Sequence, residues 1–213
     1  MLVRFVAVSL TILTAFSILT VSVLRAASVE YDYSKSIPKV GVLDIDSNKT
    51  EEIEIEYYLP YPGKVLQDNT FWFVKAARDK VWLNLTFEPL RKMDLLLLLS
   101  DKRLAGSKVL VERQKAGIAL STLGKGEKYL EEASMLEVKS RKEGVDTKSF
   151  LPKLATAALK HRQIIEELLV FAPEDLKPSI IKIEDYSNKV YKDATDAMNS
   201  LGMLGPKNPF DGN

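Results

Sequence analysis

The chain has no cysteine and only one histidine among its 213 residues. Without cysteine it has neither disulfide bonds nor thiolate metal sites, so an exported fold would be held by burial of a core alone. One imidazole without thiolates makes a poor transition-metal site, and Ala158 stands where the Glu-x-x-His motif of di-iron bundles would place a glutamate before His161. We therefore expect no metal and no cofactor.

A recognisable catalytic motif is missing as well. The stretch LGKG at residues 123–126 lacks the G-x-x-x-x-G-K-[ST] pattern of a phosphate-binding loop, and no strand is expected before it. Most adjacent acidic pairs, such as Glu166 and Glu167, have lysine or arginine three or four residues away, which is typical of a solvated helix face. These absences indicate a protein that is not an enzyme.

The chain also lacks an excess of charge of one sign. Its formal charge is +1, and the part after Arg25 carries 28 basic and 29 acidic residues, a formal charge of −1. Nucleic-acid binders normally gather a basic excess on one face, because phosphate neutralisation supplies most of their affinity. We expect no nucleic-acid partner.

The first 27 residues contain no acidic group and include a long apolar run at residues 5–24, between Arg4 and Arg25. About 20 apolar residues are needed to span a membrane, whereas the apolar part of a signal peptide has about 7 to 15. The length favours a membrane anchor, while Ala26 and Ser28 leave cleavage of a signal peptide open. In both cases we expect an exported protein, either anchored and facing outside or secreted.

The pattern divides the chain into four segments: a signal peptide or membrane anchor (1–27), an extended spacer (28–56), a helical bundle (57–201) and a flexible tail (202–213). In the spacer, Ile53, Ile55 and Tyr57 alternate with glutamates, which is the pattern of a half-buried strand. The sequence VGVLDI at residues 40–45 could pair with this strand in a small hairpin.

From residue 70 onward the apolar period is helical. Turn signals and proline positions predict about five helices, at residues 70–86, from 89 to a turn at 115–117, from that turn to about 143, 147–171 and 173–201. The expected fold class is all-α, an up-and-down bundle of about five helices preceded by a transmembrane or signal helix and a short extended segment.

The apolar stripes predict which side of each helix faces the core. For the first helix the stripe contains Phe71, Val74, Ala77, Val81 and Leu85, and we expect it to point inward. In the third helix, Gly124 and Gly126 each weaken the helix by about 1 kcal/mol relative to alanine, which predicts fraying or a break. The last helix has the most regular stripe, with alternating spacings of four and three: Leu176, Ile180, Ile183, Ser187, Val190, Ala194, Ala197 and Leu201.

A strap rich in aromatic residues and proline, residues 57–63 (YYLPYPG), precedes the first helix. The pattern Y-x-L-P-Y-P-G is followed by D-x-x-Φ-aromatic-x-Φ-K, then L-T-F-[DE]-P, an RLA triplet and L-K-H. It is formed here by Tyr57, Leu59, Pro60, Tyr61, Pro62, Gly63, Asp68, Trp72, Lys75, Leu85, Thr86, Phe87, Glu88, Pro89, Arg103, Leu104, Ala105, Leu159, Lys160 and His161. This pattern resembles a bacterial family of exported helical proteins that carry a domain of unknown function. The resemblance covers residues 57–201 and implies a fold and a location, but no activity.

The strap has two interpretations. Its prolines pre-extend the chain, so it could pack across the bundle as a structural element. Alternatively, an aromatic patch including Tyr57, Tyr58, Tyr61, Trp72 and Phe73 could bind a partner or face the membrane. His161 falls on the inward stripe of its helix, and we expect it at the boundary of the core, hydrogen-bonded to a neighbouring helix.

These observations favour a non-catalytic, extracytoplasmic helical interaction or structural module of the cell envelope. Its expected contacts are the membrane, through residues 5–24 if the leader is uncleaved, and an envelope protein. An extracytoplasmic protein that binds a small molecule or peptide is one alternative, and a hydrolase with an unrecognised site is another. The identity of the partner does not follow from the sequence.

Overall fold

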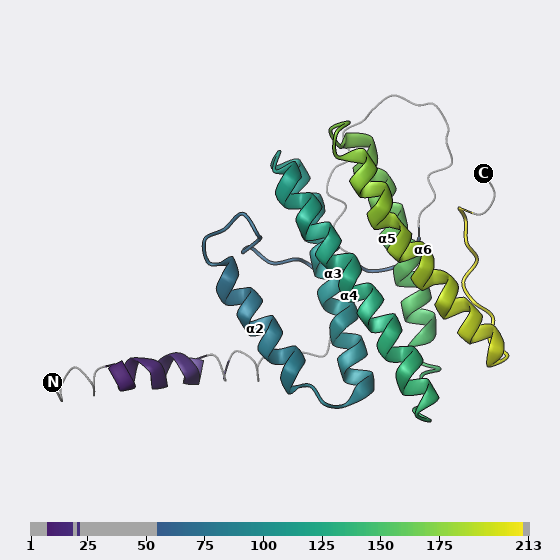
Figure 1. The fold of residues 1–213 in the computed structure, drawn as a ribbon, viewed down its shortest axis with the longest axis horizontal. Helices are drawn as coiled ribbons and strands as arrows, with labels where there is room; N and C mark the ends of the chain where they lie inside the picture. The colour runs from purple at the N-terminus through teal and green to yellow at the C-terminus, as the bar shows by residue number, and fades with distance from the viewer. Residues whose placement is uncertain (1–7, 19–20, 22–54, 211–213) are drawn as a thin grey trace.

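The computed structural model describes residues 8–18, 21 and 55–210, and all regular secondary structure in them is helical (Figure 1). The helices after the strap are α2 (Trp72–Leu85), α3 (Pro89–Glu112), α4 (Ala116–Lys142), α5 (Leu151–Phe171) and α6 (Lys177–Ser200). Residues 8–18 form a further helix. The prediction of an all-α chain is therefore confirmed.

Two earlier predictions fall largely outside the described residues. The proposed hairpin involves residues 40–45 and 53–57, of which only residues 55–57 are described, and these are not in a strand. The proposed anchor at residues 5–24 is described only in part. No helix within the described ranges is both long enough and apolar enough to span a membrane.

Helices α3 to α6 form a bundle of two helical hairpins. Helix α3 packs most extensively on α4, and α5 packs most extensively on α6. The hairpins meet through the contacts of α4 with α6 and of α3 with α5, while α2 lies at the edge and packs on α3 (Figure 1). The stripe predicted to face inward in α6 lines the core, because apolar residues spaced by three and four share one face of a helix. Ile180, Val190, Ala194 and Ala197 are buried, whereas Leu201 at the end of the stripe is 37% exposed.

Helix α4 is continuous across both glycines, so the predicted fraying or break at this point is wrong. Gly126 lies against α3, where a Cβ atom would be 3.0 Å from the Cβ of Arg103 and 3.3 Å from the carbonyl oxygen of Ser100. The Ser100 hydroxyl donates a hydrogen bond of 2.8 Å to the Gly126 carbonyl oxygen. Close approach of α3 offsets the low helix propensity of glycine here.

Side-chain and turn hydrogen bonds account for the residues at which three of the helices begin. The Glu88 carboxylate accepts hydrogen bonds from the backbone amides of Leu90 and Arg91, so α3 begins at Pro89 as predicted. Helix α5 begins later than predicted, because the Thr147 hydroxyl donates to Glu137 at 2.6 Å. A turn at residues 173–176 likewise delays α6 until Lys177.

Helix α2 spans 14 residues, shorter than the predicted range 70–86, and has the opposite orientation. Phe71, Val74 and Leu85 of the stripe predicted to face inward are 68%, 47% and 59% exposed, so this stripe points outward. The side that faces α3 instead carries Trp72, Lys75, Asp79 and Trp82, of which Asp79 is the buried residue. The prediction of an inward apolar stripe is therefore wrong for α2.

The residues after α6 pack back on the bundle. The Tyr191 hydroxyl donates a 2.7 Å hydrogen bond to the Pro206 carbonyl oxygen, and the Arg162 guanidinium lies 4.5 Å from the centre of the Phe210 ring. The described part of the C-terminal segment thus contacts both α5 and α6.

Candidate functional site

The strap crosses the bundle from α5 to α2 and is held by polar contacts along its course. Two residues before the strap, the Ile55 amide donates to the Gln163 side chain at 3.1 Å. In its middle, Leu59 and Pro62 are buried. These contacts confirm that the strap packs on the bundle, which is the structural interpretation of this segment.

Lys75 of α2 fixes the bend at the end of the strap. Its ammonium donates hydrogen bonds of 2.6 Å to the Pro62 carbonyl oxygen and 3.1 Å to the Val65 carbonyl oxygen. Between these residues Gly63 adopts φ +89°, a left-handed conformation that L side chains rarely adopt. Burial lowers the pKa of Lys75 to about 8, against the attraction of Asp79, which raises it.

A fully buried ionic cluster joins three helices at the centre of the bundle. His161 of α5 lies between Glu127 of α4 and Asp101 of α3, and all three side chains have 0% exposure. The distance from Nδ1 to the Glu127 Oε1 atom is 2.5 Å, and that from Nε2 to the Asp101 Oδ1 atom is 3.0 Å. The hydroxyl of Tyr57 in the strap donates to the second Asp101 oxygen at 2.8 Å. The cluster therefore connects the strap to the core.

The two carboxylates keep the imidazole charged. Burial alone would lower the pKa of His161, but the charge of Glu127 and the hydrogen bonds with Asp101 and Glu127 outweigh burial and raise the pKa to about 9. Burial raises the pKa of the Asp101 carboxyl, against hydrogen bonds from His161 and Tyr57 that lower it. The Glu127 Oε2 atom is buried and has no hydrogen-bond partner among the described residues. An imidazolium held by two acceptors suits a structural role for this cluster.

The cluster has no path to an external substrate. Both ring nitrogens of His161 face carboxylates, and the side chain has no exposed surface. Proton transfer to a substrate requires direct hydrogen-bond reach or one bridging water, and this arrangement leaves room for neither. Among the described residues, no group of three or more histidine, cysteine, aspartate or glutamate side chains is placed to hold a metal ion.

Sequence reasoning anticipated only part of this cluster. The hydrogen bond of His161 to a neighbouring helix is confirmed, but its position at the boundary of the core is wrong. Its partners Asp101 and Glu127 were missed. A signal for Glu127 was present, because it stands four residues after Leu123 and three before Leu130, inside an apolar stripe. A carboxylate in such a position needs a buried partner.

A second polar cluster joins α2 to α3. Asp79, which is 2% exposed, accepts hydrogen bonds from the Arg78 guanidinium, the shorter at 2.7 Å, and lies 4.0 Å from the Arg103 guanidinium. The Arg103 guanidinium also stacks 4.2 Å from the centre of the Trp72 ring. These contacts explain why α2 turns its polar side towards the bundle.

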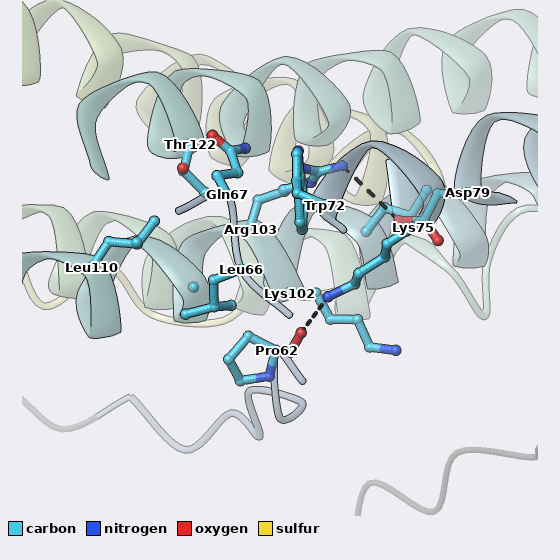
Figure 2. A pocket seen from close by; sticks show the side chains of 12 residues that line it. Pro62, Leu66, Gln67, Trp72, Lys75, Asp79, Lys102, Arg103, Leu110 and Thr122 are labelled. Atoms are coloured by element: carbon cyan, nitrogen blue, oxygen red, sulfur yellow. Dashed lines mark hydrogen bonds and ion pairs between the residues drawn. The ribbon is translucent and has the colours of Figure 1, made fainter. Parts of the chain in front are cut away.

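A small cavity lies beside this cluster, under the strap. Figure 2 shows Arg103 against Trp72 and Lys75 reaching towards Pro62. The cavity offers about 10 Å³, which is the space that a single water molecule needs. The Gln67 side-chain nitrogen is also buried without a partner among the described residues. As it stands, the cavity is too small for an organic ligand.

The five residues predicted as a partner-binding patch differ in exposure. Tyr57, Tyr58 and Trp72 are half-buried, and Tyr57 and Trp72 also contact Asp101 and Arg103. Tyr61 and Phe73 are exposed, Tyr61 in the strap and Phe73 on the outer side of α2. The patch as a whole therefore stays a prediction, with Tyr61 and Phe73 as the members that can reach a partner.

The main exposed apolar surface of α2 is formed by Phe73, Val74, Ala77 and Leu85, which we call the α2 apolar face. Phe71 directly before the helix and Phe87 after it are exposed as well. Isolated exposed apolar residues are normal, so the feature to explain is that several of them share one side of one helix.

The fold and its buried cluster define an all-helical bundle domain. A profile for a domain of unknown function (DUF5667) matches residues 64–175, more than half of the chain. The chain therefore belongs to the DUF5667 family. The match begins directly after the strap, so it covers less than the resemblance at residues 57–201. Neither the comparison with curated proteins nor that with solved structures gave a match.

Proposed function

We propose that the chain is a non-catalytic, extracytoplasmic interaction module of the cell envelope. In this proposal residues 5–24 tether the protein to the membrane, and the bundle presents the α2 apolar face to a partner. We extend the proposal to a bacterial source and to the strap as part of the family pattern, as the resemblance implies.

The α2 apolar face carries this proposal. A helix of 14 residues is marginal alone, and α2 is held on α3 by its inner side, where Asp79 and Trp72 contact Arg103. Trp82 and Leu83 also pack on the core from this side. Its apolar side adds nothing to that attachment and lies exposed. Exposed apolar groups favour association, because covering them removes apolar surface from water.

The two alternatives have less support. A binding protein for a small molecule needs a larger pocket than the cavity under the strap, which has room for about one water. A hydrolase built on His161 needs an opening to a cluster in which that side chain is fully buried.

Site-specific photocrosslinking in cells that express the full chain tests the proposal. A photoreactive amino acid replaces Phe73 in one variant and Met135 in the other, because Met135 of α4 is similarly exposed at 63%. We expect crosslinks to a partner molecule, protein or lipid, at position 73 and none at position 135. Equal labelling at both positions, or none at position 73 in a folded protein, overturns the proposed interaction.

Location has its own test. An exported bundle should be digested when protease is added to intact spheroplasts, whereas a cytosolic control protein is protected. Protection of the bundle under these conditions overturns the extracytoplasmic part of the proposal.

A further inference from the structure

Basic side chains of α2 itself lie beside the α2 apolar face. Lys80 is exposed between the apolar positions, and Arg78 is partly exposed. Between residues 69 and 87 the one acidic residue is Asp79, and it is buried. The exposed charge on α2 is therefore positive.

The nearest carboxylates on either side of α2 are already engaged. Asp68 lies before the helix and accepts hydrogen bonds of 3.0 and 3.2 Å from the Arg113 guanidinium. Glu88 lies after it and caps α3, accepting from the backbone amides of Leu90 and Arg91. The Arg113 guanidinium thus offsets the charge of Asp68, whereas Glu88 keeps its negative charge at the far end of α2.

We propose that the α2 apolar face docks on an anionic phospholipid surface. This inference rests on the proposed function and names its partner. Helices that lie in a membrane interface combine bulky apolar residues on one side with lysine or arginine, and anionic lipid adds about 1 kcal/mol for each basic residue near the surface. Phe73, Val74 and Leu85 supply the apolar part, and Lys80 supplies exposed charge.

The position of α2 suits a flat partner. Among α2 to α6, helix α2 packs on α3 alone, so it forms one edge of the bundle (Figure 1). A membrane can approach this edge without displacing another helix. A second copy of the chain is a poorer occupant, because a symmetric contact through this face would bring Lys80 near its own copy without a carboxylate to separate them.

Single-cysteine labelling can test lipid docking cleanly, because the chain has no cysteine of its own. One full-length variant carries Ala77→Cys at the centre of the α2 apolar face, and a control carries Lys192→Cys on the exposed side of α6. Each is labelled with the environment-sensitive fluorophore nitrobenzoxadiazole. Both are mixed with vesicles of phosphatidylcholine alone or of equimolar phosphatidylcholine and phosphatidylglycerol, each containing a nitroxide-labelled lipid as quencher.

We expect the label at position 77 to shift to shorter wavelength and to be quenched in the mixed vesicles, but only weakly in phosphatidylcholine. The label at position 192 should not change in either, and both variants keep residues 5–24, so insertion of that segment cannot produce the difference. Lys80→Gln in the Ala77→Cys background should lower the ratio of docked to undocked label about fivefold. Met135→Ser in the same background is the matched control and should leave the ratio unchanged.

Equal quenching at positions 77 and 192 overturns lipid docking. Quenching at position 77 that is the same with and without phosphatidylglycerol also overturns it. Protein crosslinks at position 73 without this quenching would overturn lipid docking while leaving the interaction module intact. Loss of both signals in a folded protein overturns both proposals.

Discussion

The free energy of unfolding should fall as the pH rises from 6 to 8, because His161 stays charged in the folded protein but loses its proton in the unfolded chain over this range. The pKa of His161 is about 9 in the fold, compared with 6.5 for an ordinary histidine. A difference of this size corresponds to about 3 kcal/mol of stability that is fully present below pH 6.5 and lost as the pH rises through 9. Between pH 6 and pH 8 the expected loss is about 2 kcal/mol.

Lys75 limits the pH range over which this fall in stability can be measured. Burial lowers its pKa to about 8, so above that pH the unfolded chain binds more protons at this residue than the fold does. Lys75 therefore makes stability rise with pH between about 8 and 10.5, against the effect of His161. The pKa of Asp101 is raised in the fold, so the contribution of this carboxyl to stability is also lost as the pH rises through that raised pKa. Asp101 therefore makes stability fall with pH, as His161 does. Measurements at pH 6, 7 and 8 separate the His161 effect from that of Lys75.

The assay is urea unfolding of the full chain in non-ionic detergent, followed by circular dichroism at the three pH values. Asp101→Asn is the informative variant, because it keeps the shape of the side chain and removes one charge that raises the His161 pKa. Its stability should depend less on pH than that of the unsubstituted chain. Stability that is level or rises from pH 6 to pH 8, or an equal slope in Asp101→Asn, would refute the assignment of the slope to the buried cluster.

Two further predictions concern packing. Tyr57→Phe should lower the free energy of unfolding by about 1 to 3 kcal/mol, because it removes the donor to a buried oxygen of Asp101. Tyr58→Phe should change it little, since the Tyr58 hydroxyl has no hydrogen bond to the described residues. Gly126→Ala should lower it by about 1 to 3 kcal/mol through the clash with α3, whereas Gly117→Ala, which meets nothing within 4 Å, should raise it by up to about 1 kcal/mol. Urea midpoints measure all four changes, and a stable Gly126→Ala would contradict the close approach of the helices.

Much of the bundle could be predicted from apolar spacing. Repeats of three and four residues place Leu97 and Leu104 of α3 on one face, and the same argument holds for α6, where Val190 and Ala194 are buried as expected. Each of these helices buries a wide apolar stripe against several neighbours, so only one orientation of the helix buries its apolar residues. The interruption predicted at Gly126 was wrong because helix propensity describes an isolated helix and ignores the space that a neighbour occupies.

The buried cluster could be predicted only in part. His161 and Glu127 each interrupt an apolar stripe, which signals a buried polar group, but a stripe does not say which groups on other helices meet it. Asp101 gave the same signal, because it stands four residues after Leu97 and three before Leu104. Pairing between helices depends on their relative rotation, which one sequence does not specify.

Helix α2 shows why a stripe alone cannot decide the direction that an edge helix faces. Two rows at helical spacing run along it, and each contains large apolar side chains. The outer row is the α2 apolar face, and the inner row contains Trp72, Lys75, Asp79 and Trp82. Rotating α2 about its own axis would bury the outer row and expose much of the inner row. The gain and the loss in buried apolar area would then largely cancel.

Electrostatics then decides the orientation. Arg103 of α3 is 6% exposed, and in the observed orientation it has the Asp79 carboxylate at 4.0 Å and the Trp72 ring at 4.2 Å. If α2 were rotated, the Arg103 guanidinium would face Val74 and Leu85 with no counterion. Breaking a buried ion pair by removing one partner destabilises a protein by about 3 to 5 kcal/mol, so losing the contact with Asp79 weighs against the rotated orientation. The exposed apolar row on α2 is thus a consequence of a charge on the neighbouring helix, and it leaves that row available for a partner.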